Sequence, residues 1–159
     1  GIRRYAEAAA FFVFLGGPAM AESEPPHPGS VITLPPEIHW SGKPGSNQSA
    51  TILGNPSKPG PFVTITNWVS GNISKPHYHL KSRTFIVLKG HWDFGSGPRY
   101  DEAAMKSLPE GTVVTVPAGG ILYDGCKQAP CMTEIVGDGD DPEFMVDESG
   151  KTIPSAQGR

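Results

Sequence analysis

Short apolar runs separated by turn residues limit the folds that this chain can adopt. Residues 62–68 alternate apolar and polar side chains with a period of two, and residues 84–88 and 112–116 are rich in β-branched and apolar side chains. Glycine and proline bound these runs, with 20 Gly and 17 Pro among 159 residues, and no long amphipathic helix separates them. The pattern predicts a single all-β domain, a sandwich or a barrel.

One segment between the runs has a different character. Residues 101–108 begin with Asp101 and Glu102, continue with good helix formers and are followed by Pro109. We expect a short helix of about two turns here, inserted between strands.

The first 21 residues resemble a signal peptide. Arg3 and Arg4 precede an apolar run over residues 8–15, and the segment ends in Ala19-Met20-Ala21, a small-x-small site suited to signal peptidase. The alternative is an ordered N-terminal helix. Since no later apolar stretch reaches the roughly 18 residues that a membrane helix needs, we expect a mature chain without a membrane span, located in the periplasm or secreted.

Composition divides the remainder of the chain. Residues 22–49 are rich in Pro, Gly and Ser and form an arm, which either packs on a sheet or a neighbouring subunit or stays solvated. Residues 50–147 are expected to form the barrel, and residues 148–159 a C-terminal tail. The net charge of -3 gives no electrostatic reason to expect nucleic acid as a partner.

The two cysteines, Cys126 and Cys131, are separated by four residues. In an oxidising compartment such a pair persists as a disulfide, and a connection of this length suits a hairpin with the cysteines on facing strands. The alternative is a metal or redox pair, although the spacing is not Cys-x-x-Cys.

His77 and His79 are spaced i, i+2, which on a strand places both imidazoles on one face of the sheet. Two such imidazoles can share one transition-metal ion, while two exposed or locally hydrogen-bonded histidines would show the same spacing.

The surroundings of these histidines resemble the two motifs of the cupin superfamily. The first is Gly71-x5-His77-x-His79-x3-Arg83-x6-Gly90, and the second is Gly111-x5-Pro117-x-Gly119-x2-Leu122. The resemblance covers roughly residues 62–137 and implies a double-stranded β-helix, or jelly-roll, barrel. It also implies a possible divalent transition metal, iron, manganese, nickel or zinc, and a possible homodimer.

The chain departs from the family at its ligand positions. Arg83 stands where the family has Glu, Leu122 where it has its last histidine, and Cys126 where it has Asn. A guanidinium cannot bind a cation, so the metal set is reduced to His77 and His79, with Glu134 in the last strand as a third candidate.

Three functions are compatible with these residues. The first is a periplasmic binding or accessory protein with a partly lost metal site, in which Arg83, His77 and His79 hold a small, possibly anionic, molecule. The second is a metal-dependent enzyme of the oxygenase or isomerase type that uses His77 and His79. The third is a dimeric interaction protein. The framework alone does not choose among them.

Overall fold

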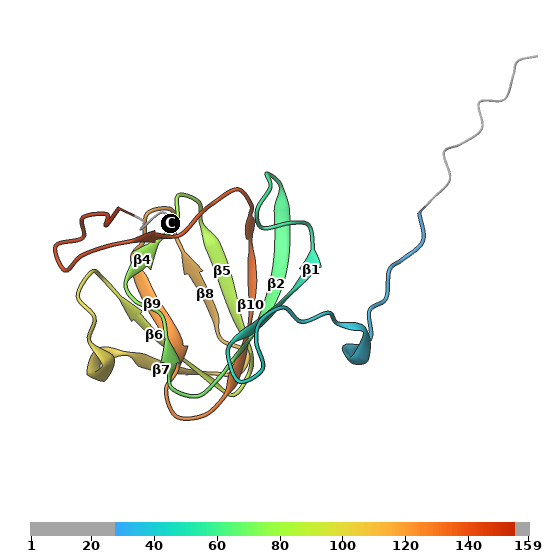
Figure 1. Ribbon diagram of the computed structural model, residues 1–159, viewed down its shortest axis with the longest axis horizontal. Coiled ribbons are helices and arrows are strands. Elements are labelled where there is room, and N and C mark those ends of the chain that lie inside the picture. Colours follow the sequence, from blue (N-terminus) through green and yellow to red (C-terminus); the bar gives the residue numbers. More distant parts are fainter. Residues whose placement is uncertain (1–27, 155–159) are drawn as a thin grey trace, which may run out of the picture. The chain divides into compact units, whose positions relative to one another are not determined.

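Two antiparallel sheets make up the fold in the computed structural model, which describes residues 28–154 (Figure 1). The first sheet has the order β1 (Gln48–Leu53), β2 (Pro61–Trp68), β10 (Cys131–Asp138), β5 (Arg83–Lys89) and β8 (Val113–Val116). The second has the order β11 (Phe144–Met145), β4 (His77–Tyr78), β9 (Leu122–Cys126), β6 (His91–Ser96) and β7 (Lys106–Pro109), with β3 (Asn72–Ile73) also paired to β9. The expected all-β double-stranded β-helix is confirmed.

The core lies between the two sheets because the period-two runs turn alternate side chains inward. The first sheet contributes Phe85, Val87 and Val116, and the second contributes Trp92 and Leu122. Trp92 is fully buried and its ring stacks on that of Phe85, with 5.1 Å between centroids. The core therefore fills the interior with side chains, as expected of a small barrel.

The expected two-turn helix at residues 101–108 is wrong in length. The structure has a three-residue 3-10 helix, η2 (Glu102–Ala104), capped by the side chain of Asp101, and the chain then enters β7. Pairing with β6 and the packing of Leu108 against the core outweigh the helix propensity of this segment.

Cys126 and Cys131 form the expected disulfide, with 6.0 Å between their Cα atoms. The expected hairpin is wrong, because β9 and β10 belong to different sheets. The bridge therefore joins the two sheets at the end of the barrel where both strands meet the turn 127–130.

Short structural elements also lie outside the barrel strands. A second 3-10 helix, η1 (Pro35–Glu37), lies in the arm, and Ser41 pairs with Ser49 ahead of the expected barrel start at residue 50. In the C-terminal part, Val146 pairs with Thr152.

The expected signal peptide, residues 1–21, lies outside the described residues. Within residues 28–154, no helix has the length and apolar character to cross a bilayer.

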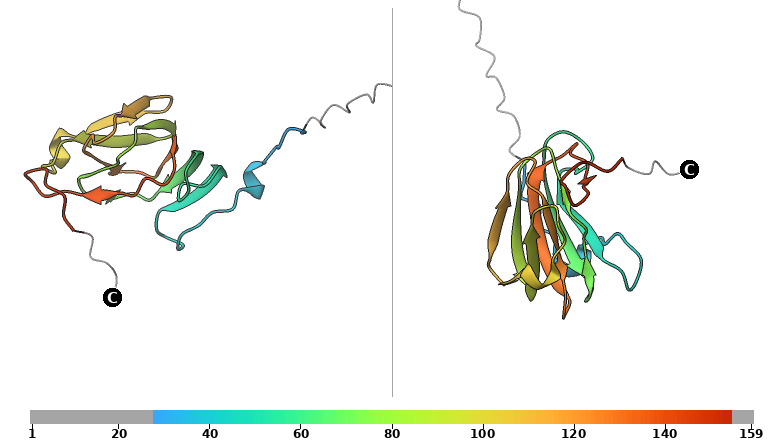
Figure 2. Two further views of the ribbon diagram at one scale, coloured as in Figure 1. Left: turned by 90° about the horizontal axis from the view of Figure 1, so that it is seen from above. Right: turned by 90° about the vertical axis from the view of Figure 1, so that its left-hand side faces the viewer.

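After β10 the chain crosses from the first sheet to the second. Residues 139–143, here called the strap, connect β10 to β11, which pairs with β4 (Figures 1 and 2). The strap runs over the end of the barrel at which β5 begins and β10 ends, here called the rim. His77, His79 and Arg83 lie at the same end.

Candidate metal centre

His77 lies on the short strand β4, where its backbone pairs with that of Leu122. The imidazole is buried, and its Nδ1 lies 2.7 Å from the carbonyl oxygen of Lys75. A carbonyl only accepts, so Nδ1 carries the proton and Nε2 keeps a free lone pair. Nε2 is thereby available as a ligand atom.

His79 follows β4, and the strap orients its ring. Its Nδ1 lies 3.3 Å from the carbonyl oxygen of Asp141 and 3.2 Å from that of Pro142. The same reasoning assigns the proton to Nδ1 and the lone pair to Nε2. The two rings stand nearly perpendicular, with 5.6 Å between centroids.

Glu143 completes the group at the C-terminal end of the strap. Its Oε2 lies 3.6 Å from Nε2 of His77, and the side chain is 52% exposed. One ligand atom from each of His77, His79 and Glu143 lies within 4.8 Å of the others. Among the described residues, this is the group of His, Cys, Asp and Glu side chains suited to a metal ion.

The three side chains fit a divalent transition metal. Ligand bonds of 2.0–2.2 Å place neighbouring ligand atoms about 3.4 Å apart in a tetrahedral site. The 3.6 Å contact between His77 and Glu143 is close to this, and the other separations among the three ligand atoms do not exceed 4.8 Å. Backbone carbonyls on both Nδ1 atoms are the partners that metal-binding histidines commonly have.

Glu134, the third ligand candidate from the sequence, takes no part in this group. Its neighbour Thr133 is fully buried and accepts a hydrogen bond from Nε1 of Trp68, so Thr133 points into the barrel. Alternation along β10 then turns Glu134 to the outer face of the sheet. Sequence reasoning missed Glu143, which lies beyond the second motif.

Arg83 begins β5 and points toward the rim, but it meets the strap. Its Nη2 donates to the carbonyl oxygen of Asp141 at 2.7 Å, and its Nε lies 3.4 Å from Oδ2 of the same residue. The Asp141 carboxylate is fully buried. It therefore compensates the charge of the guanidinium.

Leu122 occupies the position of the family's last histidine. It is 1% exposed and belongs to the core. The space that it shares with His79, Arg83, Phe85 and Val116 does not admit a sphere the size of water. The interior beneath the histidines is thus closed, and a metal at this site would be approached from the rim.

Burial and nearby charges set the protonation of the site. Desolvation lowers the pKa of His79, and electrostatic interactions with Arg83 and His77 lower it further. A depressed pKa keeps the imidazole neutral, as metal binding requires. Desolvation also lowers the pKa of Arg83, against the opposing effect of Asp141.

A second buried carboxylate, Asp124, lies on β9 inside the barrel. Oγ of Ser74 donates to its Oδ1 at 2.6 Å, and Nε1 of Trp92 donates to its Oδ2 at 3.2 Å. Burial raises the pKa of Asp124, which the two hydrogen bonds and His77 partly offset. These bonds join β9 to β6 and to the segment that leads into β4.

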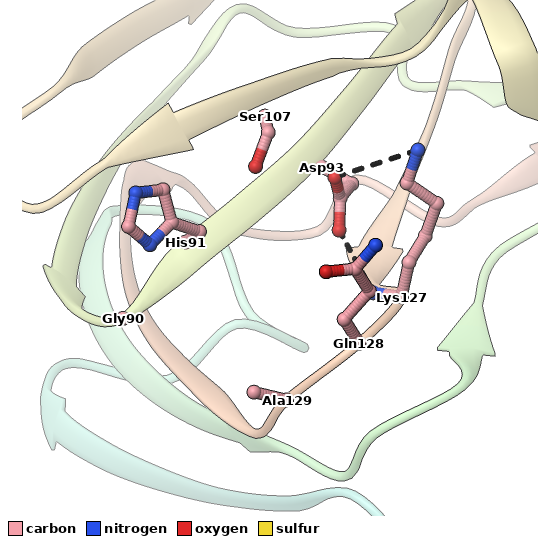
Figure 3. A pocket seen from close by; sticks show the side chains of 7 residues that line it. All are labelled: Gly90, His91, Asp93, Ser107, Lys127, Gln128 and Ala129. Carbon is pink, nitrogen blue, oxygen red and sulfur yellow. Dashed lines mark hydrogen bonds and ion pairs between the residues drawn. The ribbon is translucent and has the colours of Figure 1, made fainter.

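A polar pocket of about 410 Å³ lies at the opposite end of the barrel (Figure 3). Asp93 at its wall accepts a hydrogen bond from the backbone nitrogen of Lys127 at 2.8 Å, and its carboxylate lies 3.7 Å from Nζ of the same lysine. These contacts fix the turn between the two bonded cysteines. His91 also lines this pocket, at the end of the barrel away from His77 and His79.

Solved structures share this fold. The chain resembles the polyketide cyclase RemF from Streptomyces resistomycificus, with a TM-score of 0.61, 13% identity and coverage of 76% of this chain and 89% of the other. It also resembles an uncharacterized double-stranded β-helix protein from Klebsiella pneumoniae (TM-score 0.56, 16% identity, coverage 75% and 99%). The DMSP lyase DddQ from Ruegeria pomeroyi gives 0.54 at 16% identity, with coverage of 72% and 64%.

Similar structures also include an RmlC-like cupin from Shewanella frigidimarina (TM-score 0.55, 13% identity, coverage 69% and 91%). These likenesses show that the chain has the cupin fold. No protein-family model matches the sequence, and no curated protein matches it either.

Proposed function

We propose that this protein binds one divalent transition-metal ion at the rim of its barrel through His77, His79 and Glu143. The observation that carries the proposal is the arrangement of the two imidazoles. Each has its Nδ1 held by backbone carbonyls, and Nε2 of His77 faces the carboxylate of Glu143. Two imidazoles with one carboxylate form a donor set that suits iron, manganese, nickel or zinc.

Three protein ligands leave coordination positions open for water or a substrate, as in catalytic metal sites. We therefore propose metal-dependent chemistry on a small molecule that reaches the rim from solvent. The metal would supply Lewis acidity or activate a bound water there. The cyclase RemF and the lyase DddQ, which share this fold, are compatible with such a role.

The contacts of Arg83 weigh against the anion-binding hypothesis. That hypothesis needs an uncompensated guanidinium facing a cavity, whereas Arg83 pairs with the buried Asp141 and the space beside it is filled. The opposite charges of such a buried pair largely cancel, so little net positive charge remains to bind an anion.

The location and the assembly of the protein are part of the proposal. We propose export to an oxidising compartment, supported by the signal-like residues 1–21 and by the disulfide. We also propose a homodimer through the outer face of the first sheet. This is supported by the exposed Leu88, Val113 and Val136 on three neighbouring strands. Sedimentation of the wild type and of Val113→Glu tests the dimer, and a monomeric wild type contradicts it.

Metal content and cobalt titration test the metal site. Protein purified without a metal-chelating tag is stripped and titrated with Co²⁺, whose visible absorption reports its ligands. We expect one ion per chain, about tenfold or more weaker binding in Glu143→Gln, and loss in the His77→Ala, His79→Ala double variant. Glu134→Gln is the matched control, because it removes the same charge on the outer face of the barrel. Equal effects of the two glutamate substitutions, or no cobalt binding by the wild type, contradict the proposal.

A further inference from the structure

Arg83 stands where the family has a metal-binding carboxylate, yet it contacts the segment that carries the replacement carboxylate. We propose that Arg83 and Asp141 are positioning residues, which hold the strap so that Glu143 lies over the two histidines. The metal-binding carboxylate is thus supplied by position 143 and not by position 83, and Arg83 anchors the segment that carries it. This inference rests on the proposed metal site.

One carbonyl group connects the guanidinium to the metal-site histidine. The carbonyl oxygen of Asp141 accepts from Nη2 of Arg83 at 2.7 Å and lies 3.3 Å from Nδ1 of His79. Arg83 therefore fixes one of the two carbonyl acceptors that orient the His79 ring. Partners of this kind commonly change metal affinity by about 10- to 100-fold when they are removed.

The side chain of Asp141 fastens the strap to the loop after His79. Its Oδ1 accepts from the backbone nitrogen of Leu80 at 2.8 Å, and its Oδ2 faces Nε of Arg83 at 3.4 Å. The carboxylate is fully buried, and the Arg83 side chain is 14% exposed. This pair is thus shielded from the screening that weakens surface ion pairs.

The chain between Asp141 and Glu143 is short and stiff. Only Pro142 separates them, and its ring fixes one of its two backbone dihedrals. Glu143 is half exposed, so its place beside His77 depends on the backbone that presents it. An anchored Asp141 therefore determines where the Glu143 carboxylate lies.

A positioning role and a purely electrostatic role of Arg83 predict opposite changes in metal affinity when Arg83 is removed. A guanidinium near a divalent cation repels it, so its removal alone would raise metal affinity. If Arg83 holds the ligand in place, its removal lowers metal affinity. The sign of the change distinguishes the two roles.

The experiment measures Co²⁺ affinity and the visible cobalt spectrum in a double-mutant cycle between positions 83 and 143. We expect Arg83→Met to weaken binding by about tenfold or more and to alter the spectrum. In the Glu143→Gln background the same substitution should have a clearly smaller effect, because the carboxylate it positions is already lost and only its hold on the His79 ring remains. A general loss of barrel stability would instead weaken binding equally in both backgrounds.

Two further variants keep the test decisive. Arg83→Met with Asp141→Asn removes both buried charges together, and it replaces Arg83→Met if that variant does not fold. Lys89→Met is the matched control, since Lys89 is an exposed cation at the far end of the strand that Arg83 begins and does not contact the strap. We expect it to keep affinity within about threefold of the wild type.

The outcomes separate this inference from the proposed function. Unchanged or raised affinity in Arg83→Met, or an equal loss in both backgrounds, overturns the positioning role while the metal site stands. A wild type without cobalt binding, or one indifferent to Glu143→Gln, overturns the metal site and this inference with it.

Discussion

Restoring the family's third imidazole at position 122 is a direct test of the geometry at the rim. Leu122 pairs with His77 across β4 and β9, and directly opposed residues project from the same face with about 4.5–5.5 Å between Cβ atoms. Leu122→His therefore places a third ring beside the site. We expect it to tighten Co²⁺ binding by about tenfold or more, equivalent to 1.4 kcal/mol or more.

The substitution also has a cost that follows from burial. Leu122 is 1% exposed and packs among core residues, so its removal forfeits part of the roughly 1.5–3 kcal/mol of a buried leucine. An imidazole without partners in the closed interior adds about 1–3 kcal/mol. The metal-free variant should lose about 2–5 kcal/mol of unfolding free energy. Cobalt at 100 times its dissociation constant should return about 2.7 kcal/mol.

Urea unfolding with and without Co²⁺, together with cobalt titration, measures both effects. Leu122→Gln is the control, because it introduces a buried polar group without an imidazole. The reasoning is refuted if the two variants bind cobalt equally, or if the metal-free histidine variant is as stable as the wild type.

Three more predictions concern stability. Removing the disulfide with Cys126→Ala and Cys131→Ala should lower the urea unfolding free energy by about 2 kcal/mol, as expected for so short a loop; no change would contradict its constraint of the unfolded chain. The pKa of His79 is lowered on folding, so metal-free stability should be full above its unfolded value near 6.5 and fall as the pH drops below it. His79→Gln should flatten this decline in urea unfolding between about pH 5 and 7, and an equally steep decline would contradict it. The pKa of Asp124 is raised on folding, so its contribution to the unfolding free energy is full below its unfolded pKa of about 4 and is lost as the pH rises. Asp124→Asn should reduce the decline of the unfolding free energy with rising pH, and a steeper decline would contradict the shift.

The fold could be predicted because its signals are local. The alternating run at residues 62–68 and the apolar runs at residues 84–88 and 112–116 correctly predict the strands β2, β5 and β8. Gly90 and Gly119 adopt the positive φ values that tight turns require. Residues 106–108 form a strand and not part of a helix because they pair with β6 in the folded chain, a contact that the helix propensity of residues 101–108 does not reveal. The disulfide pair followed from the cysteine count, but not the assignment of its strands to different sheets.

The ligand site was less predictable because it depends on tertiary structure. His77 and His79 could be identified from spacing, whereas Glu143 lies in a connection without periodicity and reaches the histidines only when the strap crosses the rim. Glu134 remained a candidate because both faces of β10 carry apolar side chains. The burial of Thr133 decides between them, and no local pattern shows it.

Sequence and structure together assign Arg83 a different role from the one that the sequence alone suggests. By sequence, Arg83 replaces a metal-binding carboxylate, and Arg83→Glu alone would be expected to restore metal binding. In the structure that change would place a second carboxylate beside the buried Asp141 and release the strap that carries Glu143. Repulsion between two buried carboxylates disfavours the ionised form that a metal needs. Restoration at position 83 therefore requires Asp141→Asn in the same chain, because positions 83, 141 and 143 act as one unit.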